Sequence, residues 1–442
     1  MKKTHSFRPS TKHRSFLFCT LLSVVALLAK YPYTGAEDVV NARNNLISGS
    51  RTDFWGSFSP WFFSIVKSTH WEFFYAALFT LMVIFGANRF MVNNFKLLRR
   101  PLLFAFFLFL VYSSLIFTIS FSRDGVLLAF FWLSLGFWLT AHDKSGLLRN
   151  LLLVSSISAL SIGLSFRPWL SFSFIFLVLA FNSIYQLFTP KKSKFLLLGV
   201  LVFIAVTPVS LDLASHRILN MVASYPQQQV MIMDISSMAC LTPTRSQVDQ
   251  ALVALNSIAS EHPLTKSVLC EQYYPQNWGS VVFYGARAGQ TGALHFIEAS
   301  NEKTYEKLQE NWLGLIASNL PSYIQMKIMI GSQFLLAGES PNLSIRNLQS
   351  FLELPVNLAK SMRLYSVIPV FLLLIFSLSR TVRFSKVVEP PTYYGILFYL
   401  SFLMTSVIAF IGDNQRYIFV GAIVASLLVV QQTLKWDNEQ SQ

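Results

Sequence analysis

Long apolar segments recur along this chain, and they limit what it can fold into. Of its 442 residues, 53% are hydrophobic and only 13% are charged. Many of these segments approach or exceed the ~20 residues that a helix needs to cross a bilayer. Lipid offers the backbone no hydrogen-bond partners, so such segments have to be helical. They also lack the period-two alternation of a membrane-spanning barrel. The sequence therefore predicts an all-α, polytopic bundle of transmembrane helices.

Ten spans are predicted, seven of them before a long polar segment and three after it. This pattern divides the chain into an N-terminal membrane domain (1–211), a mostly helical outer segment (212–363) and a C-terminal membrane domain (364–442). The expected spans are 15–31, 72–90, 101–121, 126–141, 149–165, 170–188, 195–211, 364–380, 393–411 and 418–434.

The charge distribution predicts the orientation of these spans. With the N-terminus in the cytoplasm, the inner segments hold 18 of the 35 Lys and Arg residues but only 4 of the 21 acids, so they carry the whole formal charge of +14. This is the positive-inside pattern of a plasma-membrane protein. The sequence therefore predicts a multi-pass protein of a bacterial cell membrane with both termini cytoplasmic. The excess of Lys and Arg over acidic residues is explained by this orientation against an anionic inner leaflet. It therefore does not indicate a nucleic-acid partner.

The first outer loop, residues 31–71, is the most patterned of the outer segments. Thr34 and Glu37 have the spacing of a capping box, which predicts a short helix that stops at Gly49. A second short helix is expected to start at Pro60 and run to about residue 69, with aromatic side chains suited to the membrane interface. Two short helices lying on the membrane surface are therefore predicted.

Further helices are expected in the outer segment, at 296–320, 321–336 and 345–362. Cys240 and Cys270 lie in this same segment, where a disulfide would persist. Because an even count alone does not pair cysteines, a bond and two free thiols both remain open.

Four outer carboxylates are candidates for chemistry. Asp38 at a helix N-terminus suits a general base for an incoming hydroxyl, or a ligand for a divalent cation such as Mg²⁺ or Mn²⁺. Asp124, in the turn Ser122–Gly125, either shares that metal, orients a substrate, or is a turn charge. Asp234 either contacts a sugar or metal or caps a helix. Glu37 beside Asp38 either contacts substrate or only completes the capping box.

Three outer turns each carry an arginine: Arg123, Arg167 and Arg416, the last followed by Tyr417. Guanidinium groups form paired hydrogen bonds with phosphate. The sequence therefore predicts that these side chains bind a lipid phosphate or pyrophosphate, with membrane anchoring as the plainer alternative. It contains no phosphate-cradling glycine loop, nucleophile elbow or zinc motif.

The chain resembles polytopic bacterial glycosyltransferases of the GT-C superfamily, in particular an uncharacterised integral membrane branch. The resemblance rests on Tyr31-Pro32 before Asp38, on Met233-Asp234-Ile235, on Trp312 with Pro321-Ser322-Tyr323, and on the Arg416-Tyr417 pair before the last span. Where many family members place His-Pro-Pro in the first loop, this chain has Ser59-Pro60-Trp61.

The resemblance implies transfer of a sugar from a polyprenyl-phosphate donor to a glycan or lipid acceptor of the cell envelope, on the outer face of the membrane. It implies Asp38 as the catalytic base or as an acid that orients the acceptor, Asp124 as an auxiliary acid and Arg416 as a ligand of the donor phosphate. Two alternatives remain open: a multi-span transporter or lipid flippase, and a non-catalytic membrane protein of envelope assembly. The sequence shows neither a repeat of five spans nor glycine or proline interruptions at matched positions of two halves, which disfavours a transporter.

Overall fold

The described part of the chain is helical and contains no strand, which confirms the all-α class. Because apolar residues fill most of these helices, side-chain packing rather than backbone pairing joins them. The computed structural model describes residues 11–30, 37–49, 57–67, 70–120, 122–186, 194–221, 228–241, 245–257, 265–272, 301–336, 396–402, 404–405 and 416–440, together with Leu372 and Ile375.

Five of the described helices are long and apolar enough to cross a membrane, so the chain is a membrane protein. They are α4 (Trp71–Asn93), α5 (Pro101–Ile119), α6 (Arg123–His142), α7 (Gly146–Leu164) and, within α9 (Lys194–Leu219), the segment Gly199–Leu219. Shorter apolar segments lie in α1 (Thr11–Lys30) and α20 (Arg416–Gln440).

The first seven predicted spans coincide with α1, with α4 to α7, with α8 (Pro168–Gln186) and with α9. The seventh continues beyond residue 211, to Leu219. The predicted span 364–380 lies outside the described residues except for two positions. The ninth is represented by helical residues 396–402 and 404–405.

Glycines bring α4 and α6 into close contact. A Cβ atom added to Gly86 would lie 2.2 Å from the carbonyl oxygen of Trp132, and one added to Gly136 would lie 2.4 Å from the ring of Phe85. Between α6 and α7 the Ser156 hydroxyl donates to the Ser134 carbonyl at 2.9 Å. Small residues and hydroxyl contacts of this kind join helices where lipid supplies no hydrophobic driving force.

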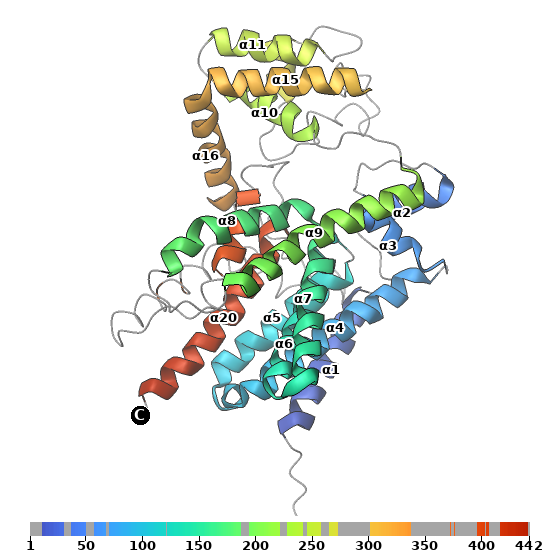
Figure 1. Cartoon of the computed structure of the whole chain (residues 1–442), viewed down its shortest axis with the longest axis vertical. Coiled ribbons are helices and arrows are strands. Elements are labelled where there is room, and N and C mark those ends of the chain that lie inside the picture. Colours follow the sequence, from blue (N-terminus) through green and yellow to red (C-terminus); the bar gives the residue numbers. More distant parts are fainter. Residues whose placement is uncertain are drawn as a thin grey trace, which may run out of the picture.

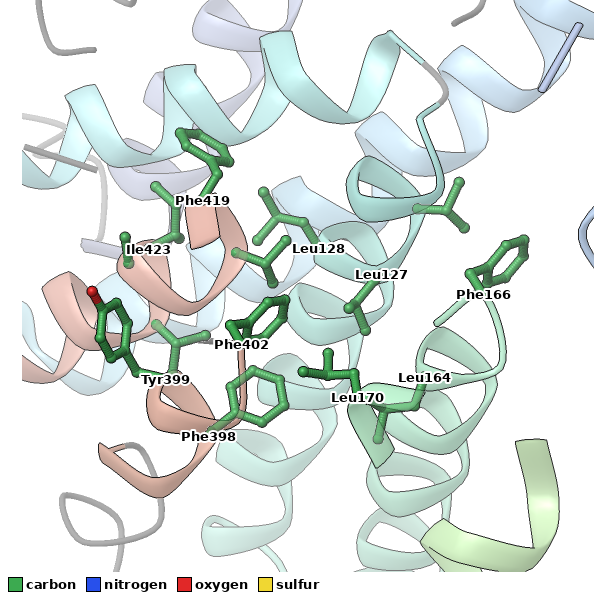
Figure 2. Close-up of a cluster of buried hydrophobic side chains, with 14 of the residues drawn as sticks. Leu127, Leu128, Leu164, Phe166, Leu170, Phe398, Tyr399, Phe402, Phe419 and Ile423 are labelled. Carbon is green, nitrogen blue, oxygen red and sulfur yellow. The ribbon is translucent and has the colours of Figure 1, made fainter. Parts of the chain in front are cut away.

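An aromatic cluster joins the C-terminal part of the chain to this bundle. Figure 2 shows Phe398 and Phe402, with Phe419 of α20, near Leu128 of α6 and Leu170 of α8. The rings of Phe419 and Phe117 of α5 have centroids 4.4 Å apart. Since aromatic rings bury large apolar surfaces, this cluster fixes α20 against the N-terminal helices.

A separate group of helices lies at one end of the molecule (Figure 1). Its core helix, α10, contacts the other four members, and the Cys240–Cys270 disulfide ties α12 to it. Asn301 caps α15, so this helix starts at Glu302, six residues later than the sequence predicted. The predicted helix at 345–362 lies outside the described residues. We call this set the outer helical group, after the outer position that the sequence predicts for it. Its members are α10 (Gln228–Leu241), α11 (Arg245–Asn256), α12 (Lys266–Gln272), α15 (Glu302–Ser318) and α16 (Leu320–Leu336).

The first outer loop forms the two short helices that the sequence predicted, α2 (Glu37–Ser48) and α3 (Phe58–Ser64). The first ends at Gly49, whose φ of +90° is a conformation that only glycine adopts without strain. Residue Thr34 of the expected capping box lies outside the described residues. The second helix ends earlier than predicted, at Ser64 rather than near residue 69.

Candidate functional site

Helix α3 is held at its N-terminal end by a carboxylate from a distant part of the chain. Asp212 of α9 accepts hydrogen bonds from the backbone N–H groups of Ser57 (2.8 Å) and Phe58 (3.2 Å). These are amides that a helix cannot satisfy internally, and a negative charge there is favourable. The Ser57 side chain makes no capping hydrogen bond. The Asp212 carboxylate therefore caps α3 in its place.

The C-terminal end of α3 is held by a cation. Buried Arg43 of α2 donates from Nε to the Phe63 carbonyl (3.2 Å) and from Nη2 to the Val66 carbonyl (3.1 Å), and its guanidinium lies 4.5 Å from the ring centre of Trp71. Burial lowers the pKa of Arg43, although an arginine remains charged. Arg43 thereby satisfies carbonyls that the C-terminal end of α3 leaves unpaired, at the point where the chain leaves helical structure.

The aromatic side chains of α3 surround one ring in the turn between α7 and α8. Phe166 lies with its ring centre 5.0 Å from that of Phe58, 5.2 Å from that of Phe62 and 6.2 Å from that of Phe63. Arg167 follows Phe166 directly. The first outer loop is therefore docked on the turn that carries one of the predicted arginines.

Asp124 and Arg167, predicted as separate site residues, form a two-point ion pair. Arg167 donates from Nε to Oδ1 at 2.7 Å and from Nη2 to Oδ2 at 2.6 Å. The Asp124 side chain is 2% exposed and that of Arg167 is 20% exposed. Ser122 caps α6 by accepting from the Gly125 amide. The carboxylate thus lies in the first turn of α6, where a negative charge is favoured.

This pairing changes the interpretation of Asp124. Both carboxylate oxygens accept hydrogen bonds from Arg167, so in this structure Asp124 orients an arginine, while its predicted roles as metal ligand or auxiliary acid stay predictions. Asp124 in turn occupies the edge of the Arg167 guanidinium that carries Nε and Nη2. Among the described residues, no group of three or more His, Cys, Asp or Glu side chains lies close enough to hold a metal ion.

Four predicted site residues occupy helix starts whose side chains lie outside the described part of the structure. Glu37 and Asp38 are the first two residues of α2, and Arg416 and Tyr417 are the first two of α20. Arg123 lies half-buried in the first turn of α6, next to Asp124 in the chain. The three-arginine phosphate clamp therefore stays a prediction.

Asp234 is not part of the contact between α3 and the α7–α8 turn. It lies inside the outer helical group. The carboxylate is 3% exposed and has three partners. Lys327 of α16 lies 2.6 Å from Oδ1, while the Tyr323 hydroxyl (2.8 Å) and the Trp312 indole N–H (3.2 Å) donate to Oδ2. Burial raises the pKa of Asp234, and these three partners oppose that rise. Asp234 is neither a helix cap nor open to a sugar; it joins α10 to α15 and α16.

Sequence reasoning missed three residues. Arg43 and Asp212 bind the two ends of α3, and Lys327 pairs with Asp234. The first two were counted only as outer or membrane-edge charges. The one available signal was at Lys327, since an isolated cation in the apolar stretch around it requires a buried partner. Comparison of the chain with protein-family models, with curated proteins and with solved structures finds no match.

Proposed function

We propose that this protein is a membrane glycosyltransferase that moves a sugar from a polyprenyl-phosphate donor to a cell-envelope acceptor. The observation that supports it best is the docking of the first outer loop. Helix α3 is bound at one end by Asp212, at the other by Arg43 of α2, and along its side by Phe166. The short helix that begins with Glu37 and Asp38 is thereby tied to the turn that carries Arg167.

The proposal includes the full topology expected from the sequence: ten spans in a bacterial cell membrane, with both termini cytoplasmic and the first outer loop outside. Five candidate spans and an outer group with a disulfide support it. A disulfide persists in an oxidising compartment, so the Cys240–Cys270 bond is consistent with an outer position for that group.

In the proposed reaction, Asp38 accepts the proton of an acceptor hydroxyl as its oxygen bonds to the sugar C1. The bond between C1 and the phosphate oxygen breaks, and polyprenyl phosphate leaves with the electron pair. Arg123 and Arg416 stabilise the departing phosphate. The structure suggests a different task for Asp124: it fixes the orientation of the Arg167 guanidinium, which in this proposal lies beside the lipid phosphate.

The test is transfer of a labelled sugar from a polyprenyl-phosphate donor in membranes that contain single variants. Asp38→Asn is expected to abolish transfer while membrane insertion and protein yield stay normal. Asn44→Ala, an exposed change on the same helix, is the matched control and is expected to retain activity. Full transfer by Asp38→Asn would remove the assignment of the base.

One observation favours a second candidate, a non-catalytic protein of envelope assembly. The carboxylate of Asp124 is buried and fully engaged by Arg167, as in an ion pair with a structural role. Analysis of a deletion strain distinguishes the two. Accumulated polyprenyl-linked donor supports transfer, whereas an unchanged donor pool with misassembled envelope glycans supports assembly. Unchanged glycans with a defect in small-molecule uptake would instead indicate the transporter alternative.

A further inference from the structure

One face of helix α16 exposes large apolar side chains at helical spacing. Leu320, Ile324 and Ile328 are 49%, 49% and 65% exposed, and they are four residues apart. Residues at this spacing lie above one another on one side of a helix. At 1.5 Å per residue, the three side chains form a stripe about 12 Å long. Pro321 and Gln325 are the other exposed residues of this face.

The side of α16 that flanks this stripe is fixed, so the stripe cannot turn inward. Lys327 is bound to buried Asp234, and the Tyr323 hydroxyl donates to the same carboxylate. Met326 and Ile330 are buried beside them, at 3% each. This buried ion pair and the two apolar contacts set the rotation of α16 about its axis, and they leave Leu320, Ile324 and Ile328 outside.

The charge distribution of the outer helical group separates α16 from its neighbour. Between residues 320 and 330, α16 has one charged side chain, Lys327, and that one is directed inward. Helix α15 is different, since it exposes charges on its water-facing surface. These exposed residues are Glu302, Lys303, Glu306, Lys307 and Glu310. An uncharged apolar face next to a strongly charged one indicates two different surroundings.

The position of α16 in the molecule identifies the surroundings of its apolar face. In Figure 1 it extends from the outer helical group toward the membrane bundle, whereas α11 and α15 lie at the far end. The spanning helices expose the same kind of surface to lipid, for example Leu102 of α5, which is 87% exposed. The apolar stripe on α16 therefore extends the apolar surface of the membrane bundle toward the outer helical group.

We infer that α16 is a membrane-contacting helix: Leu320, Ile324 and Ile328 insert into the outer surface of the lipid bilayer and hold the outer helical group against it. Apolar faces of this kind bind in the interfacial layer of a membrane. The buried Asp234–Lys327 pair is the connection between this lipid contact and the rest of the group. This inference stands whether or not the protein transfers sugar.

Spin labels on single cysteines test the inference in the full-length protein, reconstituted into vesicles of phosphatidylethanolamine and phosphatidylglycerol. The background is Cys19→Ala, which removes the one free cysteine of the described residues. Labels are placed by Ile324→Cys and Ile328→Cys, with Leu102→Cys as the lipid-facing control and Glu306→Cys as the water-facing control. Collision rates are measured with oxygen, which concentrates in lipid, and with a water-soluble nickel chelate.

The expected result is that labels at 324 and 328 collide more often with oxygen than with the nickel chelate, as the label at 102 does, while the label at 306 shows the reverse. Nickel accessibility at 324 and 328 equal to that at 306 would overturn the inference, because the stripe would then face water. Low accessibility to both reagents would also overturn it, since a second copy or another protein would then cover the stripe.

Discussion

Replacing Lys327 with methionine removes the cation from a carboxylate that has almost no contact with water. Asp234 is 3% exposed and loses its 2.6 Å contact with the ammonium group, while it keeps the hydrogen bonds from Tyr323 and Trp312. Breaking a buried pair by removing one partner costs roughly 3–5 kcal/mol, because a buried charge is left behind. Lys327→Met is therefore expected to destabilise the outer helical group by about that amount.

The assay is thermal unfolding of the detergent-purified protein, followed by tryptophan fluorescence, to which Trp312 beside the pair contributes. For a cooperative unit of roughly 150–250 residues, 1 kcal/mol lowers the unfolding temperature by about 2–4 °C. The expected fall is therefore roughly 6–20 °C. Lys303→Met on the exposed face of α15 is the matched control, and its effect is expected to stay within about 0.5 kcal/mol.

A double-mutant cycle tests the physical reason. Asp234→Asn alone leaves Lys327 without this carboxylate, while the asparagine still accepts hydrogen bonds from Tyr323 and Trp312. The double variant Asp234→Asn with Lys327→Met buries neither charge. Its loss of stability is expected to be clearly smaller than the sum of the two single losses. Additive losses, or a Lys327→Met variant as stable as the original protein, would refute the account of a buried ion pair.

Reduction of the Cys240–Cys270 disulfide, which closes a loop of 30 residues, is expected to lower the free energy of unfolding by about 3–4 kcal/mol, as thermal unfolding with and without reductant will show. Gly86→Ala is expected to lower stability and yield, because its Cβ would overlap α6, whereas Gly199→Ala, with open space around it, is expected to be neutral or slightly stabilising. Arg167→Ala leaves a buried carboxylate without two donors, so it is expected to cost roughly 3–5 kcal/mol, read from the unfolding temperature; an unchanged temperature would contradict its structural role.

Local patterns in the sequence predicted local structure well. The end of α2 at Gly49 followed from the glycine, and its positive φ shows why. The start of α16 followed from Pro321, because proline suits the first turn of a helix. The limits of α4 to α7 followed from apolar length to within three residues, whereas α9 continues eight residues beyond its predicted end at 211. In each case the determining interaction lies within a few residues along the chain.

Contacts between distant residues were not predictable in the same way. Asp212 and Ser57 are 155 residues apart, and no sequence pattern links them. Asp124 and Arg167 were each recognised, but as independent ligands, because spacing does not reveal that two outer turns meet. The motif around Asp234 and the motif that contains Trp312 and Tyr323 were likewise recognised separately, whereas in the structure Trp312 and Tyr323 both donate to the Asp234 carboxylate.

The Asp212 carboxylate also links motions. Two consecutive amides at the start of α3 share this one acceptor, and the acceptor belongs to α9, which leads directly into the outer helical group. A tilt of α9 therefore either carries α3 with it or breaks both hydrogen bonds. Events at the first outer loop and displacements of the outer helical group are in this way mechanically coupled through a single side chain.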